Sequence, residues 1–380
     1  MRILHTSDWH LGRCIESRSR IPEQEAAIED ICRIIDEERV GLVIISGDVY
    51  DSINPPAEAE KLFYGAIPKL SGNGSRPVFV VPGNHDSPER LAAVKPLAER
   101  FNAHICGFPD DTSFDMRIGS ERLALVAVPF PSERRLNEEL SRSADEASYA
   151  RDYSKKTGEL IKKGAAIFKD GSVNIVAGHF YINGGATSDS ERGIQLGGGY
   201  AVDTADMPDA QYYAMGHLHR GQRIGGREIH YSGSPLQYSK SETGYEKTVS
   251  IIDVAAGRPA DVKRRAVAQR KPIEVWRVFG IDKAIEACAA NASESSWVYL
   301  EIVTDRPVSP AEIKEMRAIR KDIVEITPIL HDDSDFPQTV REREVSIEDE
   351  FTEFYGEFRS IPPAPDVTKF FLGLCAGAEE

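Results

Sequence analysis

The chain has 380 residues, of which 41% are hydrophobic and 28% charged, and its formal net charge at pH 7 is -15. This composition is typical of a soluble globular protein with room for one large domain and a smaller one. The cysteines are odd in number and form no CxxC pair, which excludes a disulfide framework or zinc ribbon and favours a reducing cytosol. We find no signal peptide and no stretch long enough to span a membrane, so we expect a cytoplasmic protein.

The negative net charge by itself argues against a nucleic-acid partner. Two features weaken this objection. Bound divalent ions would cancel part of the negative charge, and many of the acidic side chains lie in residues 341–380. Local basic clusters remain, and we take Arg13 and Arg220 from them as candidate substrate-binding residues because both lie close to the polar motifs described below.

The first half of the chain alternates predicted strands and helices. We expect strands over 3–7, 42–46 and 78–81, and helices over 22–38, 57–70 and 88–100. Later strands at 123–128, 173–177, 212–215, 229–232 and 249–254 lie closer together. This order predicts an α/β sandwich of two mixed β-sheets flanked by helices, with the polar loops at one edge.

A second pattern begins near residue 270. The segments 273–279, 282–290, 297–304, 309–320 and 323–330 follow a β-α-β-α-β order, and Ser309-Pro310-Ala311-Glu312 forms a predicted capping box. We therefore expect a catalytic domain over 1–270, a small α/β capping domain over 271–332, and a linker with C-terminal helices over 333–380.

Two amphipathic stretches lie in the C-terminal segment. Phe351, Phe354, Tyr355 and Phe358 form one apolar face, and Val367, Phe370, Phe371 and Leu374 form the other. Two interpretations fit this pattern equally: helices packed back on the body, or a module that docks a partner.

Five short polar motifs each follow an apolar, β-branched run, where a buried strand would end. They are Asp8-Trp9-His10, Gly47-Asp48, Gly83-Asn84-His85-Asp86, Gly178-His179 and Gly216-His217-Leu218-His219. Carboxylate, amide and imidazole ligands together suit Mn²⁺, Fe²⁺ or Zn²⁺ better than Ca²⁺. Two such ions, with Asp48 able to bridge them, would support phosphoryl-group hydrolysis without a Ser or Cys nucleophile. His85 would then act on the leaving oxygen or the charged transition state, oriented by Asp86, and Asp51 could support Asp48.

This set of motifs resembles that of the calcineurin-like metallophosphoesterases. Within that superfamily the chain is similar to the SbcD family, the nuclease subunits of bacterial SbcCD complexes and counterparts of the Mre-type break-repair nucleases. The segments that carry the resemblance are MRILHTSDWHLGR, GDVYDS, VPGNHDS, MGHLHR and YSGSPLQYS. The resemblance implies that Asp8, His10, Asp48 and His219 hold one ion, that Asp48, Asn84, His179 and His217 hold the other, and that His85 is the catalytic histidine.

The family also implies an activity and partners. Its members are Mn²⁺-dependent 3′→5′ exonucleases on duplex DNA and endonucleases on single strands and hairpins, acting in break repair, recombination and replication at the nucleoid. They work as homodimers, here through helices near 57–70 and 88–100, with an SbcC-type ABC ATPase that bears a coiled coil and would dock near 345–375. One departure is visible, because Asp51 stands where some relatives carry His.

Two other functions compete with this interpretation. Another phosphoesterase of the superfamily, such as a small-molecule phosphodiesterase, could use the same ligands, but it would hardly need the extra domain and the aromatic C-terminal segment. A protein phosphatase of the superfamily is disfavoured because it typically has Arg-Gly and Glu where this chain has Asp51-Ser52 and Asp86. A non-catalytic scaffold that binds DNA ends would be expected to have lost some ligands, whereas this chain retains all of them.

Overall fold

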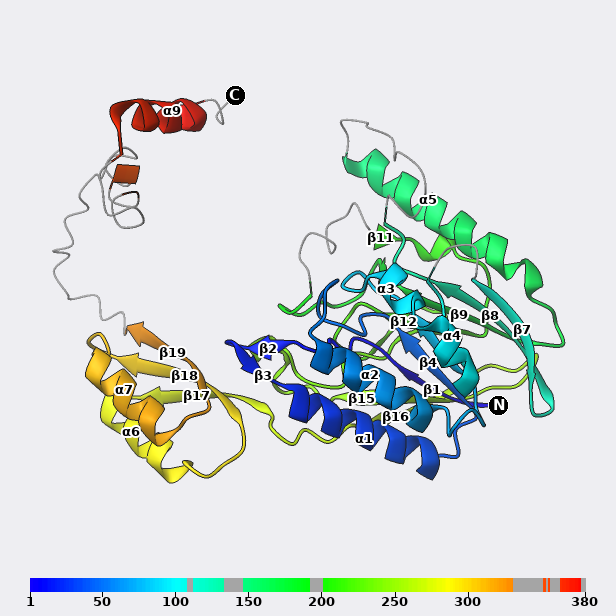
Figure 1. Ribbon diagram of the computed structural model, residues 1–380, viewed down its shortest axis with the longest axis horizontal. Helices are drawn as coiled ribbons and strands as arrows, with labels where there is room; N and C mark the ends of the chain where they lie inside the picture. The colour runs from blue at the N-terminus through cyan, green and yellow to red at the C-terminus, as the bar shows by residue number, and fades with distance from the viewer. Residues whose placement is uncertain are drawn as a thin grey trace. The chain divides into compact units, whose positions relative to one another are not determined.

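The computed structural model describes residues 1–107, 112–132, 146–191, 201–330, 351–352, 355 and 363–376. The chain divides into two compact units, Met1–Leu330 and His331–Glu380. Figure 1 shows the first unit as a body of two β-sheets with flanking helices, followed by a smaller α/β part.

The first large sheet has the strand order β16-β15-β1-β4-β5-β6. Its strands are β1 (Arg2–Thr6), β4 (Leu42–Ser46), β5 (Val78–Val81), β6 (Ala103–Ile105), β15 (Thr248–Asp253) and β16 (Asp261–Ala266). β1, β4, β5 and β6 are parallel, whereas β15 and β16 pair antiparallel. The carboxyl ends of β1, β4 and β5 therefore lie at one edge of the sheet.

The second large sheet has the order β13-β14-β12-β9-β8-β7. Its strands are β7 (Ser113–Ile118), β8 (Glu121–Val128), β9 (Val173–His179), β12 (Tyr212–Gly216), β13 (Gln222–Ile224) and β14 (Ile229–Tyr231). The four central strands are parallel and the two edge strands antiparallel. Two short pairs, β2 (Cys14–Ile15) with β3 (Arg18–Ser19) and β10 (Tyr181–Ile182) with β11 (Ala201–Val202), lie outside both sheets.

Alternating side chains separate the layers of this sandwich. Ile44 of β4 and Ile175 of β9 belong to a core between the sheets, whereas Val43 packs outward against α1 (Ile21–Glu37) and α2 (Ala57–Leu70). On the far side, Tyr153 and Ile161 of α5 (Glu146–Gly164) pack on the second sheet. The prediction of two mixed sheets flanked by helices is confirmed.

Some predicted elements differ in detail. The helix expected over 88–100 is broken into α3 (Pro88–Ala92), α4 (Lys95–Ala98) and the 3₁₀ turn η1 (Glu99–Phe101). Pro96 accounts for the break, because it has no N–H to donate to the preceding turn. Helix α5 and strands β6 and β7 were not predicted, although β7 alternates polar residues with Phe114, Met116 and Ile118.

The smaller part of the first unit is a parallel sheet, β17-β18-β19, with two helices. Its elements are β17 (Ile273–Phe279), α6 (Ile281–Ala290), β18 (Trp297–Thr304), α7 (Pro310–Ile319) and β19 (Ile323–Leu330). The predicted capping box is confirmed: the Ser309 hydroxyl accepts from the Glu312 N–H, and the Glu312 carboxylate accepts from the Ser309 N–H. Trp297 joins this part to the large body by donating its indole N–H to Glu23 at 2.9 Å.

In the second unit, α9 (Pro365–Ala376) contains the predicted apolar stretch from Val367 to Leu374. The Phe371 ring stacks on Phe351 at a centroid distance of 4.0 Å. Phe354 and Phe358 lie outside the described residues. Among the helices that the structure describes, none has the length and apolar character needed to cross a membrane.

Candidate metal centre

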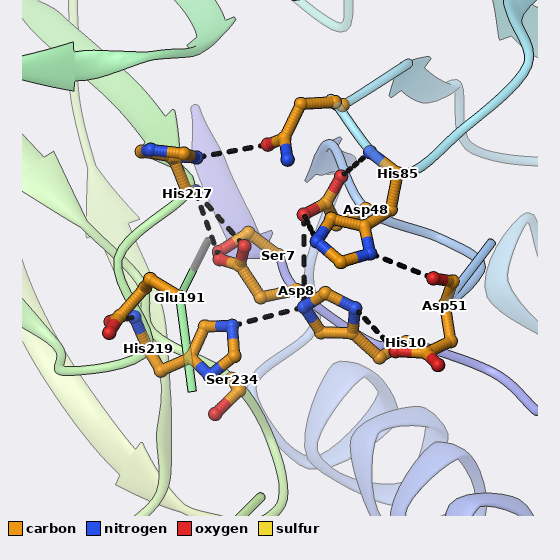
Figure 2. A network of polar contacts seen from close by, with 12 residues as sticks. Ser7, Asp8, His10, Asp48, Asp51, His85, Glu191, His217, His219 and Ser234 are labelled. Atoms are coloured by element: carbon orange, nitrogen blue, oxygen red, sulfur yellow. Dashed lines mark hydrogen bonds and ion pairs between the residues drawn. The ribbon is translucent and has the colours of Figure 1, made fainter. Parts of the chain in front are cut away.

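The five polar motifs meet where parallel strands of both sheets end. Asp8 and His10 follow β1, Asp48 follows β4, and Asn84 and His85 follow β5; His179 ends β9, and His217 and His219 follow β12. Because the two sheets face each other, the ligands from the second sheet lie opposite those from the first. Figure 2 shows Asp8, His10, Asp48, His85, His217 and His219 around a common space.

The backbone of this cluster is held in an uncommon conformation. Asp8, His10, Asp48 and His217 all have positive φ, at 54°, 45°, 49° and 102°. Non-glycine residues rarely adopt such angles, and each is unfavourable by about 1–3 kcal/mol unless the surroundings enforce it. Here the Asp8 N–H donates to the Gly47 carbonyl at 3.0 Å and the His10 N–H to the Asp48 carbonyl at 2.9 Å. Strain held in place by neighbouring loops is typical of functional sites.

The glycine that begins three of the motifs is needed for space. A Cβ on Gly47 would stand 2.1 Å from His179 Nδ1, and one on Gly83 would stand 2.0 Å from Asp48 Oδ1. A Cβ on Gly216 would stand 1.7 Å from the Ser46 carbonyl oxygen. Each glycine therefore makes room for a side chain or strand end that carries another part of the cluster.

One group of candidate ligands comprises Asp8, His10 and His219, whose ligand atoms lie within 4.8 Å of one another. The Nε2 atoms of His10 and His219 are 3.0 Å apart. The other nitrogen of His219, Nδ1, lies 2.6 Å from the Ser190 hydroxyl, which in turn donates to Glu242 at 2.6 Å. A proton on Nδ1 completes this series of hydrogen bonds, with Nδ1–H donating to the Ser190 hydroxyl. The lone pair of His219 therefore lies on Nε2 and faces His10.

A second group forms around Asn84. Its Oδ1 lies 2.9 Å from His179 Nε2 and 3.0 Å from His217 Nδ1. Asp48 Oδ2 lies 3.2 Å from the same His179 nitrogen and 3.7 Å from His10 Nε2. Asp48 therefore stands between the two groups.

The tautomer and pKa of His179 show that the space between His179, Asn84 and Asp48 favours a positive charge. Its Nδ1 donates to the Ser46 carbonyl at 2.8 Å, so the neutral ring would turn a lone pair toward the oxygens of Asn84 and Asp48. Acceptors facing acceptors are unfavourable unless a proton or metal ion lies between them. Burial lowers the pKa of His179, but the Asp48 charge outweighs it and raises that pKa to about 9. The oxygen and nitrogen donors therefore suit divalent cations of the Mn²⁺, Fe²⁺ or Zn²⁺ type.

The carboxylates respond to the same buried charges. Burial would raise the pKa of Asp48, but the surrounding imidazoles hold it well below its usual value. Asp8 differs, because burial raises its pKa to about 6 against the opposing effect of His179 and His219. Metal binding would displace protons from such a cluster.

His85 lies at the border of the cluster. Its side chain approaches solvent, with 8% of the residue exposed against none of His10 or His179. Its Nδ1 lies 2.7 Å from the Asp51 carbonyl oxygen, which accepts the ring N–H, and its backbone N–H donates to Asp48 Oδ1 at 2.9 Å. Its Nε2 faces inward, 4.0 Å from Asp48 Oδ2.

Asp86 does not orient His85, contrary to the expectation from sequence. Its carboxylate accepts hydrogen bonds from the backbone N–H groups of Val49, Tyr50 and Gly83, at 3.1, 2.9 and 2.8 Å. It therefore holds the loop after β4 against the loop after β5, and the contact with the His85 ring comes from the main chain of Asp51. The Asp51 side chain lies 3.4 Å from His10 Nδ1.

The two candidate substrate-binding arginines lie in different surroundings. The Arg13 guanidinium is 5.0 Å from the centre of the Tyr238 ring and 3.7 Å from Asp51 Oδ1. Arg220 is exposed, and its guanidinium is 4.6 Å from the centre of the Tyr245 ring.

A buried network behind His219 was missed from sequence. The backbone N–H of His219 donates to the Glu191 carboxylate at 2.8 Å. The Lys247 ammonium donates to the His219 carbonyl at 3.0 Å and to the Glu242 carboxylate. Both Glu242 and Lys247 are buried. No local pattern distinguishes them from solvated charges on a surface loop, because their burial depends on the packing of the distant segments that carry Ser190 and His219.

Comparison with known proteins points to one family. The model of the family described as calcineurin-like phosphoesterase matches residues 1–221. The SbcD component of the nuclease SbcCD from Bacillus subtilis is 38% identical to the chain over 387 residues, covering 100% of this chain and 99% of that protein. The proteins of the same name from Rhodobacter capsulatus and Escherichia coli are 31% and 30% identical, covering 81% and 80% of this chain and 82% and 78% of their own lengths.

Proposed function

Because the chain belongs to the calcineurin-like phosphoesterases and, among them, to the SbcD family of nuclease subunits, we propose that it is a metal-dependent DNA nuclease. Membership makes it a hydrolase of phosphodiester bonds. DNA as the substrate is supported by the name of the relatives, which match over the whole chain or most of it. The observation that carries the proposal is the convergence of the oxygen and nitrogen donors of Asn84, Asp48 and His179, because this donor set suits a divalent cation that would replace the proton on His179.

We assign two divalent ions, with Mn²⁺ as the metal. Asp8, His10, Asp48 and His219 would hold one, and Asp48, Asn84, His179 and His217 the other. This division is supported by the two groups of short contacts that meet at Asp48. When bound, the ions would supply Lewis acidity and an activated water for in-line attack.

His85 is the residue that we assign to the transition state. The Asp51 carbonyl accepts its Nδ1–H, so a second proton would be carried on the inward-facing Nε2. From there the imidazolium could stabilise charge on the phosphoryl group or protonate the leaving oxygen. Asp86 contributes indirectly, by fixing the loop that carries Asn84 and His85.

The family assignments complete the proposal. The chain would act as a 3′→5′ exonuclease on duplex DNA and an endonuclease on single strands and hairpins, as a homodimer at the nucleoid. Residues 1–270 would form the nuclease domain, 271–332 the capping domain and 333–380 the segment that binds an SbcC-type ATPase. The hydrophobic core that includes Ile281, Leu300 and Ile323 supports the first of these boundaries, across which Ile15 packs with Ile273, Trp297 and Val324.

The proposal is tested by incubating labelled linear duplex DNA with the purified chain, with and without added Mn²⁺. Stepwise loss of nucleotides only in the presence of metal is expected. A chain that hydrolyses a small chromogenic phosphodiester but no DNA, alone or with the ATPase, would favour the small-molecule phosphodiesterase instead.

A substitution separates chemistry from metal binding. His85→Ala should lower cleavage by roughly 10²–10⁴-fold, the usual range for a general acid or transition-state group, while metal content stays close to that of the parent. His104→Ala serves as the control, because His104 lies on the edge strand β6, where its ring stacks on Phe79 and not on a candidate metal ligand. Mass spectrometry of the bound metal and a cleavage time course measure the two effects, and full activity of the His85 variant would refute its assigned role.

A further inference from the structure

A polar pocket of about 240 Å³ opens behind His219, on the side of its backbone carbonyl. His219 contributes to its wall, and Arg220 follows His219 directly in the chain. The remaining wall comes from segments far apart in sequence, including Gly221, Gly233, Tyr245 and Arg264. The proposed function leaves this pocket without a role.

Two positive side chains in the pocket are unpaired. Arg220 and Arg264 are exposed, and neither forms an ion pair with another residue in the described part of the chain. Lys247 and Glu246 also line the pocket; Glu242 neutralises the Lys247 charge, and the exposed Glu246 carboxylate offsets one of the two guanidinium charges. In a chain with a formal net charge of -15, the positive charge that remains in the pocket favours an anionic ligand.

Arg220 is held in position without losing its hydrogen-bond donors. Arg220 stacks on Tyr245, with 4.6 Å between its guanidinium carbon and the ring centre. Stacking uses the face of a guanidinium and leaves the N–H groups in its plane free to bind a phosphate in bidentate fashion. The guanidinium carbon of Arg264 lies 3.6 Å from the point where a Cβ on Gly221 would stand.

Glycine residues form part of the pocket backbone near these arginines. Gly233 has a φ of +82°, and a Cβ there would stand 2.6 Å from the Gly221 nitrogen and 2.9 Å from the His219 carbonyl oxygen. A side chain on Gly221 would meet the Ser232 carbonyl oxygen at 2.9 Å. The glycines thus allow the loops that carry His219 and Ser232 to pack closely.

We propose that this pocket binds a backbone phosphate of the substrate strand other than the one that is cleaved. The proposal rests on the proposed nuclease function and adds to it a sequence-independent contact that positions the strand. The volume suits a phosphate with its sugar, because sites for larger ligands usually span about 300–1,000 Å³.

Binding of a fluorescent single-stranded oligonucleotide, followed by anisotropy at several salt concentrations, tests the contact without requiring cleavage. Each phosphate contact adds about 0.7 to the slope of log affinity against log salt for single strands. Arg264→Gln and Arg220→Gln should each weaken binding and reduce this slope by roughly that amount. Arg117→Gln is the matched control: Arg117 is an exposed arginine on β7, the far edge strand of the second sheet, and its loss should leave the slope as it is.

Substitutions of Tyr245 test how Arg220 is held. Tyr245→Phe keeps the ring and should bind like the parent, whereas Tyr245→Ala should behave like Arg220→Gln. Unchanged salt slopes in both arginine variants would overturn the proposal. So would arginine variants that lose inhibition by free inorganic phosphate yet bind the oligonucleotide with the parent slope, because the pocket would then take the free ion.

The proposed function is judged separately, by metal-dependent cleavage of DNA by the parent chain. A parent that binds the oligonucleotide with the expected slopes but cleaves no DNA, alone or with the ATPase, would refute the nuclease proposal while showing that the pocket binds a strand phosphate. A parent that cleaves DNA, with both arginine variants keeping its salt slope, would support the nuclease proposal and refute the phosphate site.

Discussion

At the scale of single residues, the cluster depends on side chains placed where they would be unstable alone. Asp8 and Asp48 have left-handed backbone conformations, and the acceptor atoms of His179 and Asn84 face each other. Neighbouring loops compensate for part of this strain through backbone hydrogen bonds. A bound cation would replace the proton on His179, and because it would bind the folded cluster we predict that divalent metal raises the melting temperature of the chain.

The buried pair Glu242–Lys247 supports His219 from behind and has a measurable effect on stability. Burial alone would raise the pKa of Glu242, but the hydrogen bond to His219 and the Lys247 charge hold it well below its usual value. Lys247→Met would leave this carboxylate buried and unpaired. Removal of one partner of a buried ion pair usually destabilises a protein by about 3–5 kcal/mol, and we expect a loss of this size.

Urea unfolding of Lys247→Met against the parent measures the effect. Lys240→Met is the control, because Lys240 is exposed in the turn η7 (Lys240–Glu242) and its loss should change stability little. Adding Glu242→Gln to Lys247→Met should restore part of the stability, since it removes the unpaired charge. Equal unfolding midpoints for Lys247→Met and the parent would contradict the role given to the pair.

At the scale of elements, the capping box of α7 has a predictable dependence on pH. The hydrogen bond from Arg306 and those from Ser309 lower the pKa of Glu312 to about 2 from its usual 4.5. A carboxylate with a lowered pKa stabilises the folded state above its unfolded pKa. That contribution is lost as pH falls from about 4.5 through about 2.

Hydrogen exchange of the first turn of α7 tests this prediction. Glu312→Gln should exchange faster than the parent at pH 7, and the difference should disappear below about pH 2. Glu315→Gln is the control on the same helix, since Glu315 is exposed and lies outside the box. Equal exchange in Glu312→Gln and the parent at neutral pH would show that the charge of Glu312 does not stabilise the helix.

At the scale of the whole molecule, the catalytic cluster and the C-terminal segment belong to different units, divided between Leu330 and His331. The first unit contains the cores between and outside its sheets. We therefore expect a chain that ends at Leu330 to keep its melting temperature and its cleavage of DNA, and to lose the ATPase partner.

Thermal melting, DNA cleavage and size-exclusion chromatography with the ATPase check these three outcomes. Phe370→Ala in the full chain tests a single contact, because Phe370 is 70% exposed on α9. Its loss should weaken binding of the ATPase without changing the melting temperature of the chain. A truncated chain that still binds the ATPase would contradict the assignment of residues 333–380.

The sequence by itself determined the layers of the sandwich and the places where the polar motifs fall. Alternating and continuous apolar runs such as those around Val43 and Ile175 specify buried strands because burial follows the period of the backbone. Glycine followed by Asp, Asn or His marks the strand ends, since only glycine leaves room for the ligand that crosses it. The capping box of α7 is likewise local, because all its hydrogen bonds join residues within one turn.

Only the tertiary structure decided which polar groups pair across the fold. Asp86 binds the main chain of a loop 36 residues away along the sequence, not its neighbour His85. Glu242 and Lys247 resemble surface charges until the loop that carries Ser190 covers them. The open pocket between Arg220 and Arg264 also needs strands β13 to β16 in place. The physical reason is common to all three: hydrogen bonds and charge pairs between distant segments depend on distances that the folded sheets set, and no local pattern records them.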